Sequence, residues 1–177
     1  MITCLEGVMS NNLKNFIKDG QKLPMFGIGP YLIYGMAFLN VAVIILTAYV
    51  FKTGTLTDLW VYVFRIAGAL FILSGAVIWF IGAMRSGMDK HISENILKTD
   101  GIYAMVRNPM YSGCWFLITG IGMMWHNVFI IPVFFIDWLI MTVVLKNTEE
   151  KWLLNVYGDE YVKYKKTVNR CIPGFPK

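Results

Sequence analysis

The chain has 177 residues, of which 56% are hydrophobic and only 15% are charged, and its formal net charge is +5. Soluble domains are usually about half apolar and a quarter charged, so this composition excludes an ordinary soluble domain and indicates a membrane protein. We interpret the positive charge as a sign of membrane topology and lipid headgroup contact, not of nucleic-acid binding.

The N-terminal segment lacks the basic start, apolar middle and small-residue cleavage site of a secretory signal peptide. We therefore expect residues 1–26 to form a cytoplasmic or interfacial arm. Residues 27–177 contain no linker or low-complexity segment, which predicts a single membrane domain.

Apolar stretches of membrane length follow the arm. A bilayer core requires about 20 apolar residues in a helix. Residues 27–51 contain no charge, and residues 60–84 contain only Arg65 near their start. Two shorter stretches, 110–125 and 128–145, are separated by only two residues and predict a transmembrane helical hairpin. The expected fold class is an all-α integral-membrane bundle of about four transmembrane helices.

Small residues recur on one face of the second predicted span. Gly68, Gly75 and Gly82 are seven residues apart, which places them on nearly the same side of a helix. Glycines on one face let a neighbouring helix approach closely. We expect this face to be a helix contact and not a functional site.

Positive charges in the connecting segments predict the orientation. Three lysines precede the first span, whereas only Lys52 lies between the first and second. Four Lys or Arg residues lie from Arg85 to Arg107, none lies in the hairpin turn, and seven follow Leu145. Both termini are expected to be cytoplasmic.

The C-terminal tail, residues 146–177, is predicted to contain a cytoplasmic amphipathic helix. Its apolar positions follow helical spacing, and Gly158 is expected to interrupt the helix. These positions are Trp152, Val156, Tyr157, Tyr161, Tyr164 and Val168.

The sequence "RNPMY" (residues 107–111) begins the third span. Asn108 is a good helix N-cap and Pro109 a favoured first residue, so these two alone explain where the helix starts. The free N–H groups of that helix end, with Arg107 beside them, also form a natural site for a carboxylate or phosphate. Tyr103 and Tyr111 are expected to flank it.

Glu149 and Glu150 follow the fourth predicted span. Because the hairpin returns the chain to its starting level, we expect them to lie near "RNPMY". Neighbouring helical residues point about 100° apart. One carboxylate is therefore expected to face the site, with the other solvated or paired with a tail lysine. Which of the two faces it stays open, and carboxylates at a helix C-terminus would oppose the helix dipole.

Residues 98–173 together resemble the isoprenylcysteine carboxyl methyltransferase and phospholipid methyltransferase family of integral-membrane enzymes. The family pattern is an Arg-His-Pro-x-Tyr motif before a helical hairpin, a Glu-Glu pair after it, and a tail ending in Arg-x-x-Pro. The corresponding parts here are "RNPMY", "EE" and "RCIP". Asn108 replaces the family histidine, which preserves the helix start but removes an imidazole.

The resemblance implies S-adenosylmethionine as cofactor and methyl transfer to a lipid-like or small apolar acceptor, most simply a carboxylate or a thiol. It implies catalytic roles for Arg107, Glu149 and Glu150. It further implies a cofactor site formed by these and by Tyr103, Asn108, Pro109, Tyr111, Tyr161, Tyr164 and Arg170. The alternatives are a nicotinamide-dependent membrane reductase of the sterol-reductase kind and a non-enzymatic four-span membrane protein.

Other polar residues carry weaker expectations. Asp137 lies within the fourth predicted span, where it either lines a lipid-substrate pocket or is protonated or hydrogen bonded to another helix. The three cysteines are far apart and fit no metal-ligand or disulfide spacing, so no metal site is predicted. The oligomeric state is left open.

Overall fold

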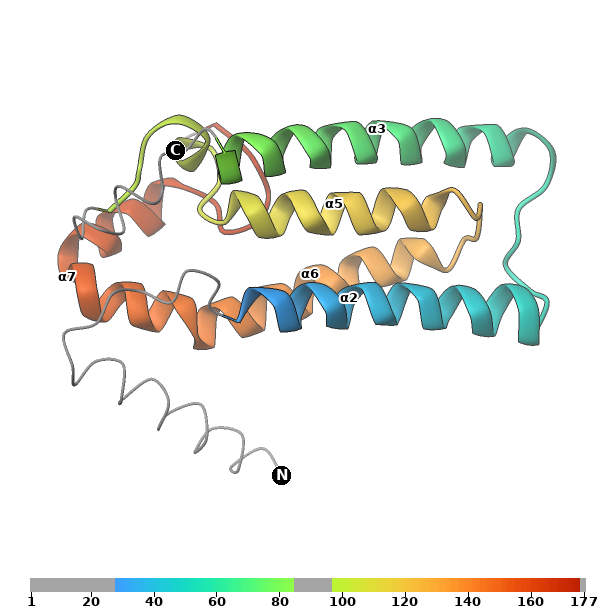
Figure 1. Ribbon diagram of the computed structural model, residues 1–177, viewed down its shortest axis with the longest axis horizontal. Helices are drawn as coiled ribbons and strands as arrows, with labels where there is room; N and C mark the ends of the chain where they lie inside the picture. The colour runs from blue at the N-terminus through green and yellow to red at the C-terminus, as the bar shows by residue number, and fades with distance from the viewer. Residues whose placement is uncertain (1–27, 85–96, 176–177) are drawn as a thin grey trace, which may run out of the picture.

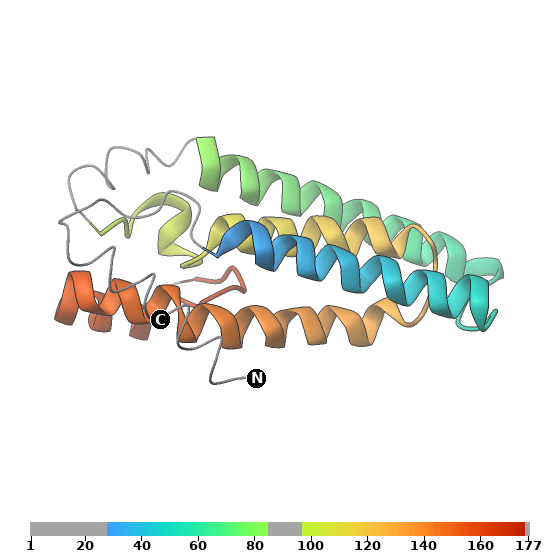
Figure 2. The ribbon, with the colours of Figure 1, turned by 60° about the horizontal axis from the view of Figure 1, so that its bottom comes forward.

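The structure, a computed structural model, describes residues 28–84 and 97–175. The predicted N-terminal arm lies outside this range. The described chain is helical, with no strand and only an isolated bridge between Thr55 and Asn127 (Figures 1 and 2). The all-α prediction is therefore confirmed. The helices are α2 (Gly29–Ile44), the π-helix η1 (Ile45–Val50), α3 (Asp58–Met84), the 3-10 helix η2 (Gly101–Ala104), α5 (Pro109–Met123), α6 (Ile130–Asn147) and α7 (Glu149–Thr167).

Three helices among the described residues are long and apolar enough to cross a membrane: α2 continued by η1, α3 and α6. The predicted spans 27–51, 60–84 and 128–145 correspond to them. Helix α5 has 15 residues and is about 22 Å long, shorter than a bilayer core of about 30 Å. The structure thus supports three spans of full length and not the expected count of four.

The short helix α5 packs lengthwise against α3, as Figures 1 and 2 show. A Cβ atom added to Gly75 would lie 2.7 Å from the Gly113 carbonyl oxygen, and one added to Gly68 would lie 2.9 Å from that of Gly120. A Cβ atom added to Gly82 would lie 3.0 Å from the Pro109 Cβ. The predicted glycine face is therefore a close helix contact, and α5 meets it with glycines of its own.

The core lies between α2, α5 and α6 and includes one tail residue. Its buried members are Leu32, Met36, Tyr111, Trp115, Met141, Leu145 and Cys171. The Trp115 indole stacks on Phe134 with ring centroids 4.3 Å apart, and its N–H donates to the Phe134 carbonyl oxygen at 3.2 Å. These contacts fix the predicted hairpin of α5 and α6.

The two ends of the bundle are closed differently. At the end we call the hairpin end, the loop after η1 pairs with the turn between α5 and α6. The Leu56 amide donates to the His126 carbonyl oxygen, and the Val128 amide donates to that of Gly54, both at 2.8 Å. At the opposite end, the tail end, α5 begins, α6 ends and the C-terminal residues return.

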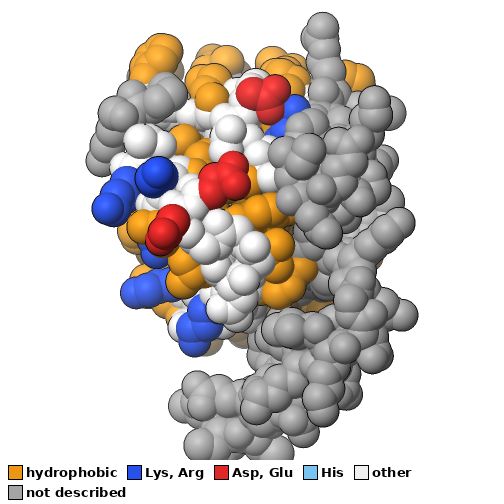
Figure 3. All heavy atoms as spheres, turned by 90° about the vertical axis from the view of Figure 1, so that its left-hand side faces the viewer, with side chains coloured by type: hydrophobic (Ala, Val, Ile, Leu, Met, Phe, Trp, Pro, Cys, Tyr) orange, Lys and Arg blue, Asp and Glu red, His pale blue; other side chains and the backbone are white. Residues whose placement is uncertain are grey.

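Helix α7 has an aromatic side and a basic side. It continues α6 away from the bundle and turns at Gly158, where φ is 53° and ψ is −126°, as predicted (Figure 1). Tyr161, Tyr164 and Val168 form a buried cluster. The lysines of α7, Lys151, Lys163, Lys165 and Lys166, are exposed. Figure 3, which faces the tail end, shows Lys or Arg side chains gathered along one side of this face.

Candidate active site

The tail is tied to the segment that precedes α5. The Arg107 and Asn108 amides donate to the carbonyl oxygens of Asn169, at 2.9 Å, and Arg170, at 3.1 Å. The Gly174 amide donates to the Met105 carbonyl oxygen at 3.0 Å. Backbone hydrogen bonds therefore hold the tail against the start of α5, a contact that helical patterning could not predict.

Asn108 and Pro109 occupy the N-cap and first helical positions, as expected. The Asn108 side chain nevertheless makes no cap hydrogen bond, so this part of the prediction is wrong. Its Nδ2 donates to the Arg170 carbonyl oxygen at 3.1 Å, because the returning tail offers an acceptor beside it. Asn108 thus fastens the tail, and its own carbonyl oxygen accepts from the Ser112 amide and hydroxyl.

Arg107 lies beneath the tail with only 8% of its side chain exposed. Its Nη1 lies 3.0 Å from Glu150 Oε1 and donates to the Tyr161 hydroxyl at 3.2 Å. Its Nε has no hydrogen-bond partner among the described residues. A buried guanidinium N–H without an acceptor is unusual, since such groups are normally satisfied.

Glu150 lies between two guanidinium groups. Arg170 donates to both of its oxygens, from Nε to Oε1 and from Nη2 to Oε2, the latter at 3.0 Å. Burial raises the pKa of the Glu150 carboxyl, but the hydrogen bond from Arg170 and the charges of Arg107 and Arg170 outweigh burial and lower it. The same hydrogen bond raises the pKa of Arg170. The three side chains form a charged cluster fixed as ions.

Glu149, unlike Glu150, has no arginine among the groups that shift its pKa. Burial raises the pKa of its carboxyl, while hydrogen bonds from the Tyr111 hydroxyl and from the Ile28 backbone amide oppose this increase. The Tyr111 hydroxyl packs against Gly29, where an added Cβ would lie 3.1 Å away. Glu149 therefore joins the start of α2 to the start of α5.

Both carboxylates face inward, which corrects the expectation that only one would do so. The backbone breaks at Thr148, with φ −116° and ψ −85°, so the two glutamates begin α7 instead of ending α6. In the first turn of a helix the dipole favours negative charge, whereas we expected it to oppose them. The partner of Glu150 is also Arg170, not a tail lysine.

The tyrosines of the predicted site lie in two groups. Tyr111 bonds Glu149, whereas the Tyr164 hydroxyl donates to the Tyr103 carbonyl oxygen at 2.6 Å. Tyr161 is buried beside Arg107, and burial and the charge of Glu150 raise its pKa to about 12. Tyr161 is therefore a neutral hydrogen-bonding group at physiological pH.

The family model described as phospholipid methyltransferase matches residues 62–160, more than half of the chain. The chain belongs to this family. The match begins within α3 and ends within α7, so it includes "RNPMY" and both glutamates but not Arg170. It supports the resemblance stated from the motifs.

Two curated relatives share part of this family sequence. The protein-S-isoprenylcysteine O-methyltransferase of Schizosaccharomyces pombe is 35% identical over 94 residues, which cover 49% of this chain and 37% of the relative. The protein of the same name from Dictyostelium discoideum is 28% identical over 116 residues, covering 60% and 48%. The chain thus spans less than half the length of these relatives. No solved structure matches significantly.

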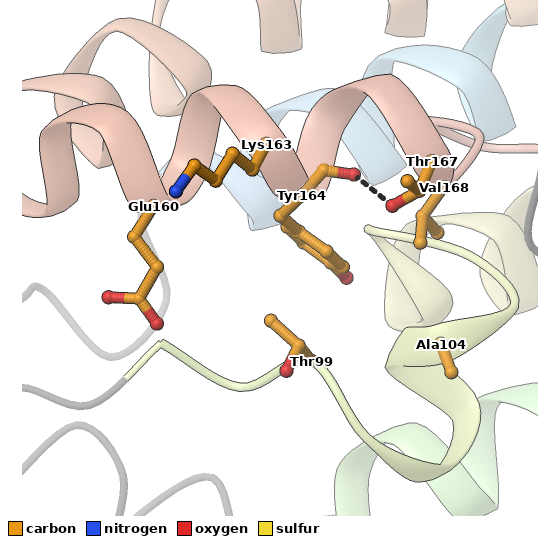
Figure 4. A pocket seen from close by; sticks show the side chains of 7 residues that line it. All are labelled: Thr99, Ala104, Glu160, Lys163, Tyr164, Thr167 and Val168. Atoms are coloured by element: carbon orange, nitrogen blue, oxygen red, sulfur yellow. Dashed lines mark hydrogen bonds between the residues drawn. The ribbon is translucent and has the colours of Figure 1, made fainter.

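The structure of this family member also contains an open hollow of about 370 Å³ between the second half of α7 and the segment before α5 (Figure 4). Figure 4 shows Glu160 and Lys163 on one side and Thr99 on the other. The hollow shares only Tyr164 with the predicted site residues. Of its remaining lining residues, Val168 was predicted only as an apolar position of the tail helix, and Ala104 and Thr167 gave no signal in the sequence.

Sequence reasoning also missed Ile28. The Ile28 contribution comes from its backbone amide, which residue type does not reveal. Cys171 adjoins Arg170 but is buried in the core, and burial raises the pKa of its thiol to about 12. It is therefore a packing residue in thiol form and not a nucleophile.

Proposed function

We propose that the chain is an integral-membrane methyltransferase that uses S-adenosylmethionine and methylates a carboxylate on a lipid-like or small apolar acceptor. The family and the names of both relatives support methyl transfer, and those names specify an oxygen acceptor. Three membrane-length helices support a membrane location. A thiol is the second acceptor class.

The observation that carries the proposal is the buried Arg107 with its unpaired Nε–H. Glu150 and Tyr161 hold the other side of the guanidinium, so its orientation is fixed before any ligand binds. In the first turn of α5, Pro109 has no N–H and the Ser112 amide already donates to the Asn108 carbonyl oxygen, so the Met110 and Tyr111 N–H groups are those without a partner within the helix. This end of the protein therefore fits a ligand carboxylate such as that of S-adenosylmethionine.

The surrounding residues fit the other parts of the same molecule. Glu149, with Tyr111, would meet the α-ammonium or the ribose hydroxyls, and Tyr103, Tyr161 and Tyr164 would border the adenine. Asn108 and Arg170 would keep the tail closed over the site, through the hydrogen bonds described above. When bound, S-adenosylmethionine supplies an electrophilic methyl group on its sulfonium.

The protonation states favour an acid acceptor. A carboxylate is already a nucleophile at neutral pH, whereas a protonated amine requires a base. Glu150 is committed to two arginines, and Glu149 already accepts two hydrogen bonds. The protein then acts mainly by positioning the two reactants and by excluding water.

We further propose that residues 27–177 act as one methyltransferase domain and that the tail end faces the cytoplasm. The exposed lysines of α7 and the positive charge of the tail support this orientation. Labelling of a single cysteine introduced at Phe175 by a membrane-impermeant reagent, in sealed inside-out vesicles, tests it. Labelling only in right-side-out vesicles contradicts it.

Methyl-labelled cofactor tests the reaction itself. Purified protein in lipid is supplied with S-prenylcysteine, a free fatty acid or phosphatidylethanolamine. We expect a base-labile labelled ester from one of the acids, and no ester with Arg107→Ala. Label only in the amine headgroup would reject the carboxylate acceptor but retain methyl transfer. Binding of NADPH without S-adenosylhomocysteine would instead favour the reductase alternative.

A further inference from the structure

A polar pair is buried between α2 and α6, away from the candidate active site. Asp137 is 0% exposed and Asn40 is 3% exposed. Asn40 Nδ2 donates to Asp137 Oδ2 at 2.7 Å and to the Met36 carbonyl oxygen at 3.0 Å. One acceptor of each side chain, Asn40 Oδ1 and Asp137 Oδ1, has no donor among the described residues. If Asp137 is ionised, the pair is therefore left with two unsatisfied acceptors.

The pair lies deep in the predicted membrane region. Ile28 and Glu149 meet at the tail end. Asn40 lies twelve residues after Ile28 along α2, and Asp137 lies ten residues before Asn147, where α6 ends. Twelve helical residues rise about 18 Å. Since a bilayer core is about 30 Å thick, the pair is near its middle, where an ionised carboxylate is costly.

Within residues 28–84 and 97–175, no basic residue is placed to neutralise Asp137. Helices α2 and α5 contain no Lys, Arg, Asp or Glu, and the only other charged residue of α6 is Lys146, near its end. Arg65 of α3 is exposed. On α5, the buried Thr119 hydroxyl also has no hydrogen-bond partner in the described chain, and an added Cβ on Gly122 would lie 3.3 Å from Asn40 Oδ1. The surroundings therefore offer oxygen atoms and no positive charge.

We propose that Asp137 is a neutral carboxylic acid whose Oδ1–H donates to Asn40 Oδ1. One proton turns the unsatisfied Asp137 oxygen into a donor and gives the Asn40 oxygen its missing hydrogen bond. The amide and the acid then form two hydrogen bonds to each other. This neutral pair fastens α2 to α6 at depth, and it does not depend on the proposed methyl transfer.

Infrared spectroscopy of the protein in lipid at neutral pH tests the proposal. We compare unlabelled protein with protein carrying carbon-13 in its aspartate carboxyl groups, which separates aspartate from glutamate. We expect an aspartate band in the region of protonated carboxyl groups. Asn40→Leu should shift this band to higher frequency, because the acceptor is lost, and Asp137→Asn should remove it.

Asp159→Asn is the matched control, since Asp159 is an exposed aspartate of α7, and it should leave the band unchanged. Absence of the band in the unaltered protein would overturn the proposal and indicate an ionised Asp137. A band that Asn40→Leu does not shift would overturn the donation to Asn40. The wild-type measurement stands even if Asp137→Asn fails to fold.

Discussion

The two ends of the bundle are both closed by segments distant in sequence, yet with different chemistry. At the hairpin end, the buried Asn127 donates to Thr47 Oγ1 and accepts from the Phe129 amide, both at 2.9 Å. These partners are neutral, and Asn127 has no unpaired side-chain atom. At the tail end, Arg107, Glu150 and Arg170 form a charged cluster in which Arg107 Nε has no partner in the part of the chain that the structure describes.

This difference separates a cluster that only stabilises the fold from one suited to a ligand. Structural polar groups are normally satisfied within the protein. A fixed charge with a donor to spare is instead typical of binding sites. The tail end therefore fits a functional role, and the hairpin end fits a structural one.

The largest expected effect comes from Glu150→Gln at the tail end. This change leaves two partly buried guanidinium groups without their carboxylate, and removing one partner of a buried ion pair costs about 3–5 kcal/mol. We expect a large decrease in the thermal unfolding temperature in detergent. Glu160→Gln, in an exposed part of the same helix, is the control and should have little effect. Equal stability of the two variants would show that the charged cluster is not a structural element.

Arg107→Lys tests the spare donor with a smaller change. A lysine can still pair with Glu150 but has no atom in place of Nε. Because a hydrogen bond to a charged group is worth about 1.5–3 kcal/mol, we expect about 10- to 100-fold weaker binding of S-adenosylhomocysteine. Isothermal titration calorimetry measures this affinity. Unchanged affinity would mean that Nε does not meet the ligand.

Asn127→Leu makes the corresponding change at the hairpin end. It leaves Thr47 and the Phe129 amide unpaired, at an expected cost of about 1–3 kcal/mol. The unfolding temperature should fall, while S-adenosylhomocysteine affinity should stay the same. Loss of affinity at this distance would contradict the separation of the two ends.

The smallest effect concerns the pH dependence of the two glutamates. The pKa of Glu150 is lowered by folding, so its stabilising contribution is present above its unfolded pKa and is lost as pH falls through its folded pKa. The pKa of Glu149 is raised, so its contribution is present at low pH and is lost as pH rises through its folded pKa.

Unfolding temperatures measured from about pH 4 to pH 8 distinguish the two. The unfolding temperature of Glu149→Gln should equal that of the wild type at the acidic end, and it should rise relative to the wild type as pH increases. Glu150→Gln should be most destabilised at neutral pH and approach the wild type in acid. Parallel curves for both variants would refute the opposite pKa shifts.

The sequence predicted the parts of this arrangement that depend on apolar length and tight turns. The two-residue gap between the last apolar stretches implied a hairpin, and a hairpin brings Arg107 and Glu150 to one level, as the 3.0 Å ion pair shows. The glycine spacing on α3 likewise predicted a close helix contact, although not that α5 is the partner.

Features that depend on tertiary contacts could not be predicted. The break at Thr148 is invisible in residue types that also suit a continuing helix, so the glutamates were assigned to the wrong helix end. The Asn108 side chain follows the tail and not its own helix, since the acceptor comes from Arg170, 62 residues away. The end of α5 was placed two residues too late, at residue 125 instead of Met123, because apolar residues continue into the turn.

Titration of S-adenosylhomocysteine into the wild type, Arg107→Ala and Asn127→Leu tests the central claim that the tail end holds the methyl donor. We predict binding to the wild type and to Asn127→Leu, and loss of binding in Arg107→Ala while its helical circular dichroism is retained. Equal binding to a folded Arg107→Ala would contradict the account.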